Sequence, residues 1–197
     1  EIMPSLVGSE MCIRDRYTPA SIEFVDIAGL VKGASKGEGL GNKFLSNIRE
    51  CDAIVHVVRC FENDDIIHVE GNINPARDIE TINLELILAD LESVNKRYAR
   101  VEKIARTAKD KDAVAEFNVL KKLKPVLEDG KSARTIDFDE DETKVLKSLF
   151  LLTSKPVLYV ANVSEDEVGE PDNIEYVKQI RDFAATENAE VLSLIHI

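Results

Sequence analysis

The sequence predicts an α/β fold, a parallel sheet with an inserted antiparallel helical hairpin. Three short runs rich in Val and Ile, typical of buried parallel strands, occupy residues 21–26, 53–59 and 157–163. Patterns typical of amphipathic helices alternate with these runs, at residues 42–49, 142–152 and 174–185. Because strands and helices that alternate along a chain form parallel sheets covered by helices, we expect an α/β sheet.

A longer helical pattern separates the second and third apolar runs. Between residues 84 and 108, apolar side chains recur at alternating spacings of three and four residues, as in the seam of a coiled coil. The seam consists of Leu84, Ile87, Leu91, Val94, Tyr98, Val101, Ala105 and Ala108. A second helical run spans residues 114–127 after a polar break, and we expect Pro125 to kink or end it. Two such runs around a short turn predict an antiparallel helical hairpin.

The charge of the chain is unevenly distributed. The 197 residues include 25 basic and 37 acidic side chains, a net charge of −12, yet residues 96–124 hold ten basic and only four acidic side chains. The more common explanation of such a charge run is a solvated face on a stalk. The alternative is a basic surface that meets RNA or an acidic partner, since clustered Lys and Arg neutralise phosphates.

The composition also restricts the compartment. No apolar run approaches the roughly 18 residues that a membrane span requires. Residues 1–16 carry charges at both ends, unlike a secretory signal. The three cysteines lack the paired spacing of a disulfide framework and fit a reducing compartment. We therefore expect a cytoplasmic protein without a membrane partner.

The first apolar run ends in an Asp-x-x-Gly motif, Asp26 to Gly29. Ligands of open α/β sheets bind beyond the carboxyl ends of strands, so Asp26 is a candidate Mg²⁺ ligand, acting through water. The backbone N–H of Gly29 is a candidate contact for a terminal phosphate. Five of the nine glycines lie between Gly29 and Gly41, a density that suits a ligand-ordered switch segment. The alternative is a flexible linker.

The third apolar run ends in Asn162-Val163-Ser164-Glu165. In GTPases the equivalent strand ends in Asn-Lys-x-Asp, whose carboxylate accepts the N1–H and 2-amino protons of guanine. Val163 here replaces the Lys and Glu165 replaces the Asp, so the carboxylate is displaced by one methylene and bidentate guanine pairing is weakened. The alternative is an Asx turn followed by a surface glutamate.

Together these motifs resemble the Obg-like ATPase (YchF) family. The resemblance is carried by the residues from Asp26 to Glu50, 56–64 and 162–165, and it runs from about Tyr17 to about Val191. It implies a P-loop nucleotide-binding domain with an inserted coiled coil and a C-terminal TGS domain. It also implies hydrolysis of ATP in preference to GTP, a requirement for Mg²⁺, and association with ribosomes or ribosomal RNA in translation.

The resemblance implies a role for each candidate residue. Asn162, Val163 and Glu165 would meet the nucleotide base, with Gly29 at the phosphates and Asp26 at Mg²⁺. Leu30 stands where Ras-like enzymes have a water-orienting Gln, so no side chain is an evident catalytic base, and Gly29 and Leu30 mark only the switch loop. His56 lies within a predicted strand, where a histidine is more often a core residue than a catalyst.

The sequence also departs from the family. It contains no G-x-x-x-x-G-K-[ST], and no first switch or TGS domain is recognisable. Residues 1–16 and 192–197 resemble translated adaptor sequence, so we expect an internal fragment that is inactive by itself. The expected division is 1–16, a non-native segment; 17–77, nucleotide-binding domain, first part; 78–135, coiled-coil insertion; 136–191, nucleotide-binding domain, second part; 192–197, a non-native tail.

One alternative function stays open at this point. A non-enzymatic adaptor would use the basic hairpin to bind ribosomal RNA or protein, and the α/β part would serve only as a scaffold. A P-loop upstream in the gene would favour the enzyme, and its absence there would favour the adaptor.

Overall fold

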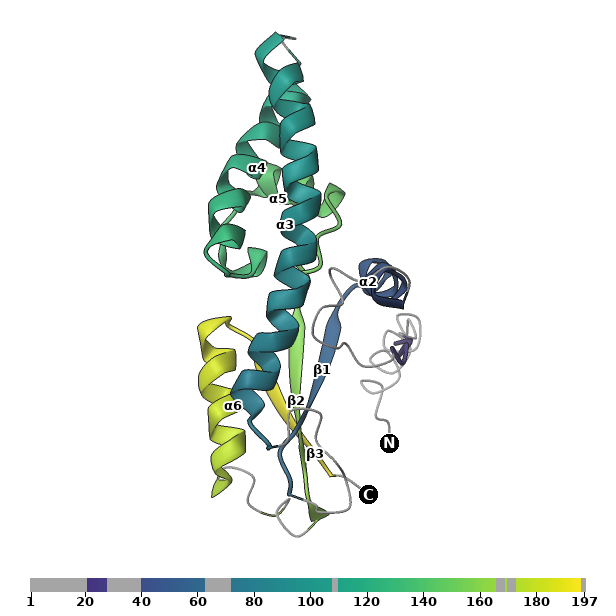
Figure 1. The fold of residues 1–197 in the computed structure, drawn as a ribbon, viewed down its shortest axis with the longest axis vertical. Helices are drawn as coiled ribbons and strands as arrows, with labels where there is room; N and C mark the ends of the chain where they lie inside the picture. Colours follow the sequence, from purple (N-terminus) through teal and green to yellow (C-terminus); the bar gives the residue numbers. More distant parts are fainter. Residues whose placement is uncertain are drawn as a thin grey trace, which may run out of the picture.

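The computed structural model describes residues 21–27, 40–62, 72–107, 110–165, 169 and 173–195 (Figure 1). The α-helices are α2 (Leu40–Glu50), α3 (Pro75–Thr107), α4 (Lys111–Glu128), α5 (Glu140–Ser148) and α6 (Glu175–Thr186), with a 3₁₀ turn, η2 (Ala133–Thr135). The strands are β1 (Ile54–Arg59), β2 (Val157–Val163) and β3 (Glu190–Ile195). In this part of the chain, no helix is long and apolar enough to cross a membrane.

The three strands form a parallel sheet in the order β1-β2-β3. One face packs against α3 and α6, in a buried cluster that we call the sheet core. Its fully or almost fully buried members are Val58, Cys60, Ile79, Tyr159, Ala161, Val163, Val177, Ile180 and Ala184. Side chains alternate between the faces of a strand, and Val55, Val57, Leu192 and Leu194 on the opposite face are exposed. The parallel α/β sheet expected from the sequence is confirmed.

The inserted helices form the expected antiparallel hairpin, which extends away from the sheet (Figure 1). The buried hairpin core joins Ile87, Val94 and Val101 of α3 to Val119, Leu120, Leu123 and Leu127 of α4, with residues of the returning chain. Tyr98 and Phe117 stack across the hairpin with ring centroids 5.1 Å apart.

Two details of the hairpin differ from the expectation. Leu84 is 50% exposed, because α3 turns other residues toward the sheet and α2 at this level, so Leu84 is not part of the seam. Pro125 lies inside α4, which continues to Glu128, so Pro125 does not end the helix. The proline cannot donate to the carbonyl four residues before it, so α4 continues past Pro125 with one intrahelical hydrogen bond fewer.

The strand expected at residues 21–26 is not formed. Residues 21–27 pair with no strand of the described sheet, and Ile22, Phe24 and Val25 are 81%, 78% and 56% exposed. A strand requires a neighbour for its backbone hydrogen bonds, and the described residues place none beside this segment. Only Ile27, at its end, packs against the cluster between α2 and α3.

A third strand, β3, lies where no strand was expected. β3 includes residues 192–195, part of the stretch expected to be a non-native tail, and it pairs in parallel with β2 from Leu158↔Glu190 to Val163↔Ile195. Backbone hydrogen bonding to β2 and the contact of Val191 with the sheet core hold this segment in place.

Candidate functional site

The candidate base-binding residues lie at the carboxyl end of β2, the central strand. Asn162 is flanked in register by Arg59 on β1 and Leu194 on β3. The N–H of Cys60 donates to the carbonyl oxygen of Asn162 at 2.7 Å, which fixes the end of β2 against the end of β1. This is the edge of an open α/β sheet at which ligands bind.

Val163 and Glu165 face different surroundings. The side chain of Val163 is fully buried in the sheet core, so only its backbone remains for a ligand. Glu165 is exposed just after the strand end. The structure therefore places Asn162, Val163 and Glu165 at one edge of the sheet. The carboxylate of Glu165 is available to solvent there, whereas the aliphatic side chain of Val163 points into the sheet core and not toward a ligand at this edge.

The end of β1 contributes residues for which the sequence analysis gave no role. Arg59 Nε donates to the carbonyl oxygen of Phe61 at 3.0 Å, and the guanidinium lies 4.7 Å from the centroid of the Phe61 ring. The hydroxyl of Tyr176 donates to Glu62 at 3.0 Å, joining the start of α6 to this loop. Arg59, Phe61 and Glu62 had one signal in the sequence, their membership of the segment 56–64 that carries the family resemblance, and Tyr176 lay only in the helical pattern at 174–185.

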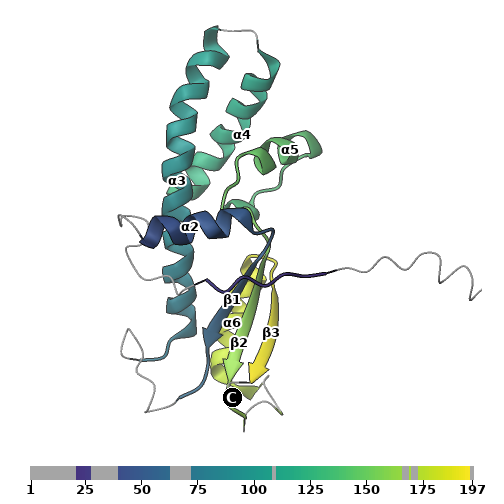
Figure 2. The ribbon, with the colours of Figure 1, turned by 90° about the vertical axis from the view of Figure 1, so that its right-hand side faces the viewer.

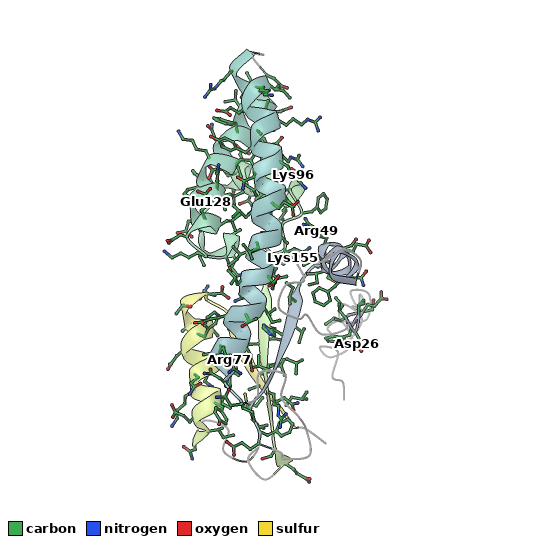
Figure 3. The ribbon with its side chains drawn as sticks, viewed as in Figure 1. Asp26, Arg49, Arg77, Lys96, Glu128 and Lys155 are labelled. Carbon is green, nitrogen blue, oxygen red and sulfur yellow. The ribbon has the colours of Figure 1, made fainter. Side chains whose placement is uncertain are left out.

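Asp26 does not lie at this edge of the sheet. Figure 3 shows it beside α2, on the side of the molecule away from α6 and not at the carboxyl ends of β1 and β2. Its side chain is exposed. Gly29 and Leu30, the other candidates from the switch loop, lie outside the described residues.

The described residues do not form a Mg²⁺ site by themselves. Among them, no three His, Cys, Asp or Glu side chains cluster as metal ligands, and Asp26 is a single exposed carboxylate distant from the base-binding residues. Mg²⁺ needs near-octahedral oxygen ligands, usually completed by water and substrate phosphates. No chemical step through a metal follows from these residues.

His56 is a structural residue. Its ring faces the buried ring of Tyr159 across the strand pair, with centroids 5.6 Å apart. Burial, and then the positive charge of Arg134, lower the pKa of His56 to about 4, so the imidazole is neutral near pH 7. Burial raises the pKa of Tyr159, whose hydroxyl donates to Glu187 at 2.7 Å. The interpretation of His56 as a core histidine is confirmed.

Comparisons with known proteins agree with this architecture. A family model described as "50S ribosome-binding GTPase" matches residues 10–118. The chain is 60% identical over 184 residues to the "Ribosome-binding ATPase YchF" of Bacillus subtilis (strain 168), covering 93% of this chain and 50% of that protein. It is 53% identical over 184 residues to the protein of the same name in Escherichia coli O157:H7, with the same coverage.

A solved structure is also similar. That of the Schizosaccharomyces pombe YchF GTPase has a TM-score of 0.70 and 37% sequence identity, and the match covers 85% of this chain and 46% of that one. The aligned 184 residues exceed the stretch from Tyr17 to Val191, so the similarity extends beyond the limits recognised in the sequence. The chain spans about half the length of the curated relatives it matches. By these matches and its fold, the chain belongs to the family of 50S ribosome-binding GTPases and, within it, to the Obg-like YchF proteins.

Proposed function

We propose that the protein containing this chain is a cytoplasmic ATPase that binds the ribosome, takes ATP in preference to GTP, and uses ATP together with Mg²⁺. The printed names of its relatives support ATP hydrolysis and ribosome binding for those proteins. The name of the similar solved structure refers to GTP instead, so the choice of base requires a physical argument.

The placement of Val163 carries this proposal. Guanine-specific sites lay a lysine side chain along the base and accept two guanine protons with an aspartate. Here the side chain at position 163 is buried in the sheet core, and the exposed carboxylate of Glu165 is one methylene longer. Two donors of guanine then lack matched acceptors, a loss of about 1–3 kcal/mol, while the backbone of Val163 can still meet the adenine edge.

The test is a titration of ATP and GTP, each with Mg²⁺, into a full-length protein. A full-length chimera is suitable, in which residues 17–191 of this chain replace the aligned half of the Bacillus subtilis relative. We expect ATP to bind at least as tightly as GTP. GTP binding tenfold tighter than ATP, about 1.4 kcal/mol, would contradict the assignment.

A matched variant separates the base contacts from general damage. In the chimera, Glu165→Asp shortens the carboxylate without changing its charge, so the ratio of GTP to ATP affinity should rise. Glu175→Asp, at the exposed start of α6, makes the same chemical change outside the candidate site and should leave that ratio unchanged.

For the ribosome, the outer surface of the hairpin is the proposed contact. Arg100, Lys111 and Lys121 are exposed and form no ion pair with another described residue. Other basic residues of the hairpin are paired, among them Arg97 with Glu116 and Lys122 with Glu142. The unpaired positive charges are available to phosphates, whereas paired ones are partly neutralised.

A further inference from the structure

Phe150 presents an aromatic side chain to solvent from an unfavourable backbone conformation. The residue follows α5 and is 65% exposed, whereas Leu149 and Leu151 on either side of it are buried. Its φ of 51° lies in the left-handed region, which glycine adopts without the steric cost that a side chain adds. Neither the exposed ring nor the strained backbone stabilises the fold, and strain of this kind clusters at functional sites.

Contacts from two helices hold Phe150 at the end of the hairpin nearest the sheet. Its N–H donates to the carbonyl oxygen of Lys147 at 3.3 Å, and its carbonyl oxygen accepts from Arg49 Nη1 at 3.3 Å. Arg49 Nη2 donates to the hydroxyl of Ser93 on α3 at 3.2 Å. Figure 2 shows α2 crossing α3 at the level where the sheet gives way to the hairpin. The ring is therefore exposed at a fixed position beside α3.

Cations lie on the side of α3 that makes this contact. Ser93, Lys96 and Arg100 recur at spacings of three and four residues, so they share one face of α3. Arg100 is exposed and lies about 10 Å along the helix from Ser93. Lys147 is exposed three residues before Phe150. Neither Arg100 nor Lys147 forms an ion pair with another described residue, so both positive charges are available to a ligand.

The surroundings of the ring favour an unpaired nucleic-acid base over an apolar protein groove. Its exposed neighbours in the chain, Lys147 and Ser148, are polar, and an apolar groove would need further exposed apolar side chains beside the ring. Bases of single-stranded RNA stack on aromatic rings, while lysine and arginine bind the neighbouring phosphates. The exposed carboxylates of Glu50 and Asp52, at and after the end of α2, disfavour the closely spaced phosphates of a duplex. A short single strand therefore fits this surface best.

We propose that Phe150 binds ribosomal RNA by stacking on one unpaired base, with Lys147 and Arg100 at the flanking phosphates. Arg49 is a positioning residue, because its hydrogen bonds to the carbonyl oxygen of Phe150 and to Ser93 hold the ring beside α3. This contact rests on the proposed ribosome binding, and it adds a base-stacking site to the charged surface of the hairpin. The match to 50S ribosome-binding GTPases makes ribosomal RNA the source of the strand.

The experiment measures binding of the full-length chimera to two probes. Co-sedimentation follows binding to ribosomes, and fluorescence anisotropy follows binding to a short single-stranded RNA of mixed sequence, alone and annealed to its complement. We expect the single strand to bind more tightly than the duplex. Phe150→Ala should weaken binding to the single strand and to ribosomes by about fivefold or more, because the stacking of a base on the ring is lost.

Matched variants identify the chemistry at position 150. Phe150→Tyr keeps an aromatic ring, so its affinity for the single strand should stay within about twofold of wild type. Phe150→Leu keeps apolar bulk without an aromatic face, so it should lose affinity as Phe150→Ala does. Leu84→Ala is the control, because Leu84 is another exposed apolar side chain, on α3, and its loss should leave both affinities unchanged. Thermal unfolding of each variant shows whether it is folded.

The outcomes distinguish stacking from other roles of the ring. Wild-type affinity in Phe150→Leu would indicate an apolar protein groove and overturn the stacking, as would equal binding of the single strand by wild type and Phe150→Ala. A marked loss of thermal stability in Phe150→Ala would mean that the rest of the full-length protein covers the ring, which also overturns it. Any of these results with ribosome binding intact leaves the proposed function standing, whereas a wild-type chimera that does not sediment with ribosomes overturns both.

Discussion

Thr153 donates twice to Asp90, from its backbone N–H at 2.8 Å and from its hydroxyl at 2.7 Å, both to Oδ2. The hydroxyl of Thr153 also accepts from the N–H of Ala133 at 3.2 Å. The Asp90 side chain of α3 thereby orients the segment that precedes β2. Through Thr153 it also orients the segment around Ala133, which follows α4.

Asp90→Asn should destabilise the chain. In wild type, both carboxylate oxygens of Asp90 accept hydrogen bonds from Leu152 and Thr153. In the variant an NH₂ group replaces one of these oxygens, so at least one buried hydrogen bond is lost, which lowers the free energy of unfolding by about 1–3 kcal/mol. Chemical denaturation should show a lower midpoint with an unchanged denaturant dependence. An unchanged midpoint would mean that these hydrogen bonds do not contribute to stability.

The same variant isolates a pH dependence. Burial raises the pKa of Asp90 above 3.8, an effect partly offset by the hydrogen bonds from Thr153 and Leu152. The native state then holds this proton more tightly than the unfolded state, so the contribution of Asp90 to the free energy of unfolding is greatest below pH 3.8 and declines as pH rises through the native pKa. The stability advantage of wild type over Asp90→Asn should shrink as pH rises from below 3.8 through the native pKa, and a constant difference would contradict this.

Phe150→Gly should stabilise the chain. Phe150 directly follows the C-cap residue of α5, and its φ of 51° lies in the left-handed region that a side chain disfavours. The residue is 65% exposed. Relief of roughly 1–2 kcal/mol of backbone strain exceeds the entropic cost of glycine, and the net gain should be about 0.5–1 kcal/mol. Thermal unfolding measures it, with Phe150→Ala as the comparison that removes the ring but keeps the strain.

Leu123→Ala and Leu84→Ala form a matched pair on the two long helices. Leu123 is fully buried in the hairpin core, so its truncation should cost about 2–5 kcal/mol. Leu84 is 50% exposed, and its truncation should cost less than about 1 kcal/mol. Equal losses in denaturant unfolding would restore Leu84 to the hairpin seam that the sequence predicted.

Reversal of the unpaired hairpin charges should weaken ribosome association of the full-length chimera. Arg100→Glu with Lys121→Glu removes two cations available to phosphates, so affinity should fall and its log–log salt slope should decrease by roughly two units. Lys178→Glu with Arg181→Glu, on α6, makes the same charge change away from the hairpin and serves as the control in co-sedimentation. Equal loss in both variants would indicate a general effect of net charge.

The isolated 197-residue chain should show no ATPase activity above background, even with millimolar Mg²⁺. Its sequence contains no G-x-x-x-x-G-K-[ST], so the backbone cradle and lysine that bind the phosphates are missing. The full-length chimera is the positive control in a phosphate-release assay. Turnover by the isolated chain that persists through purification and disappears on Asp26→Ala would contradict the prediction.

Local patterns predicted several elements whose partners lie within the described chain, although β3 was not among them. The apolar run at 157–163 coincides with β2, and the helical pattern at 174–185 agrees with α6 within one residue, because one buried face determines each of them. The run at 21–26 has the same composition as a buried strand, but none of the described strands lies beside it. Strand formation depends on that neighbour, and a single run does not reveal it.

The candidate site was predictable in part for the same reason. Asn162 and Glu165 could be placed at a strand end from their own segment. The proximity of Asn162 to Arg59 depends on the register between β1 and β2, which are separated by almost 100 residues that include the inserted hairpin. The contact of Arg49 with Ser93 likewise depends on how two helices cross, which neither helical pattern specifies.

α3 contributes to every buried apolar cluster of the described structure. Ile79 lies in the sheet core, Leu86 and Ala89 lie in the cluster between α2 and α3, and Val94 lies in the hairpin core. Loss of this helix would expose all three clusters together. We therefore expect the sheet and the hairpin to unfold together, although one is inserted in the other. Calorimetry should record a single cooperative transition whose van't Hoff and calorimetric enthalpies agree.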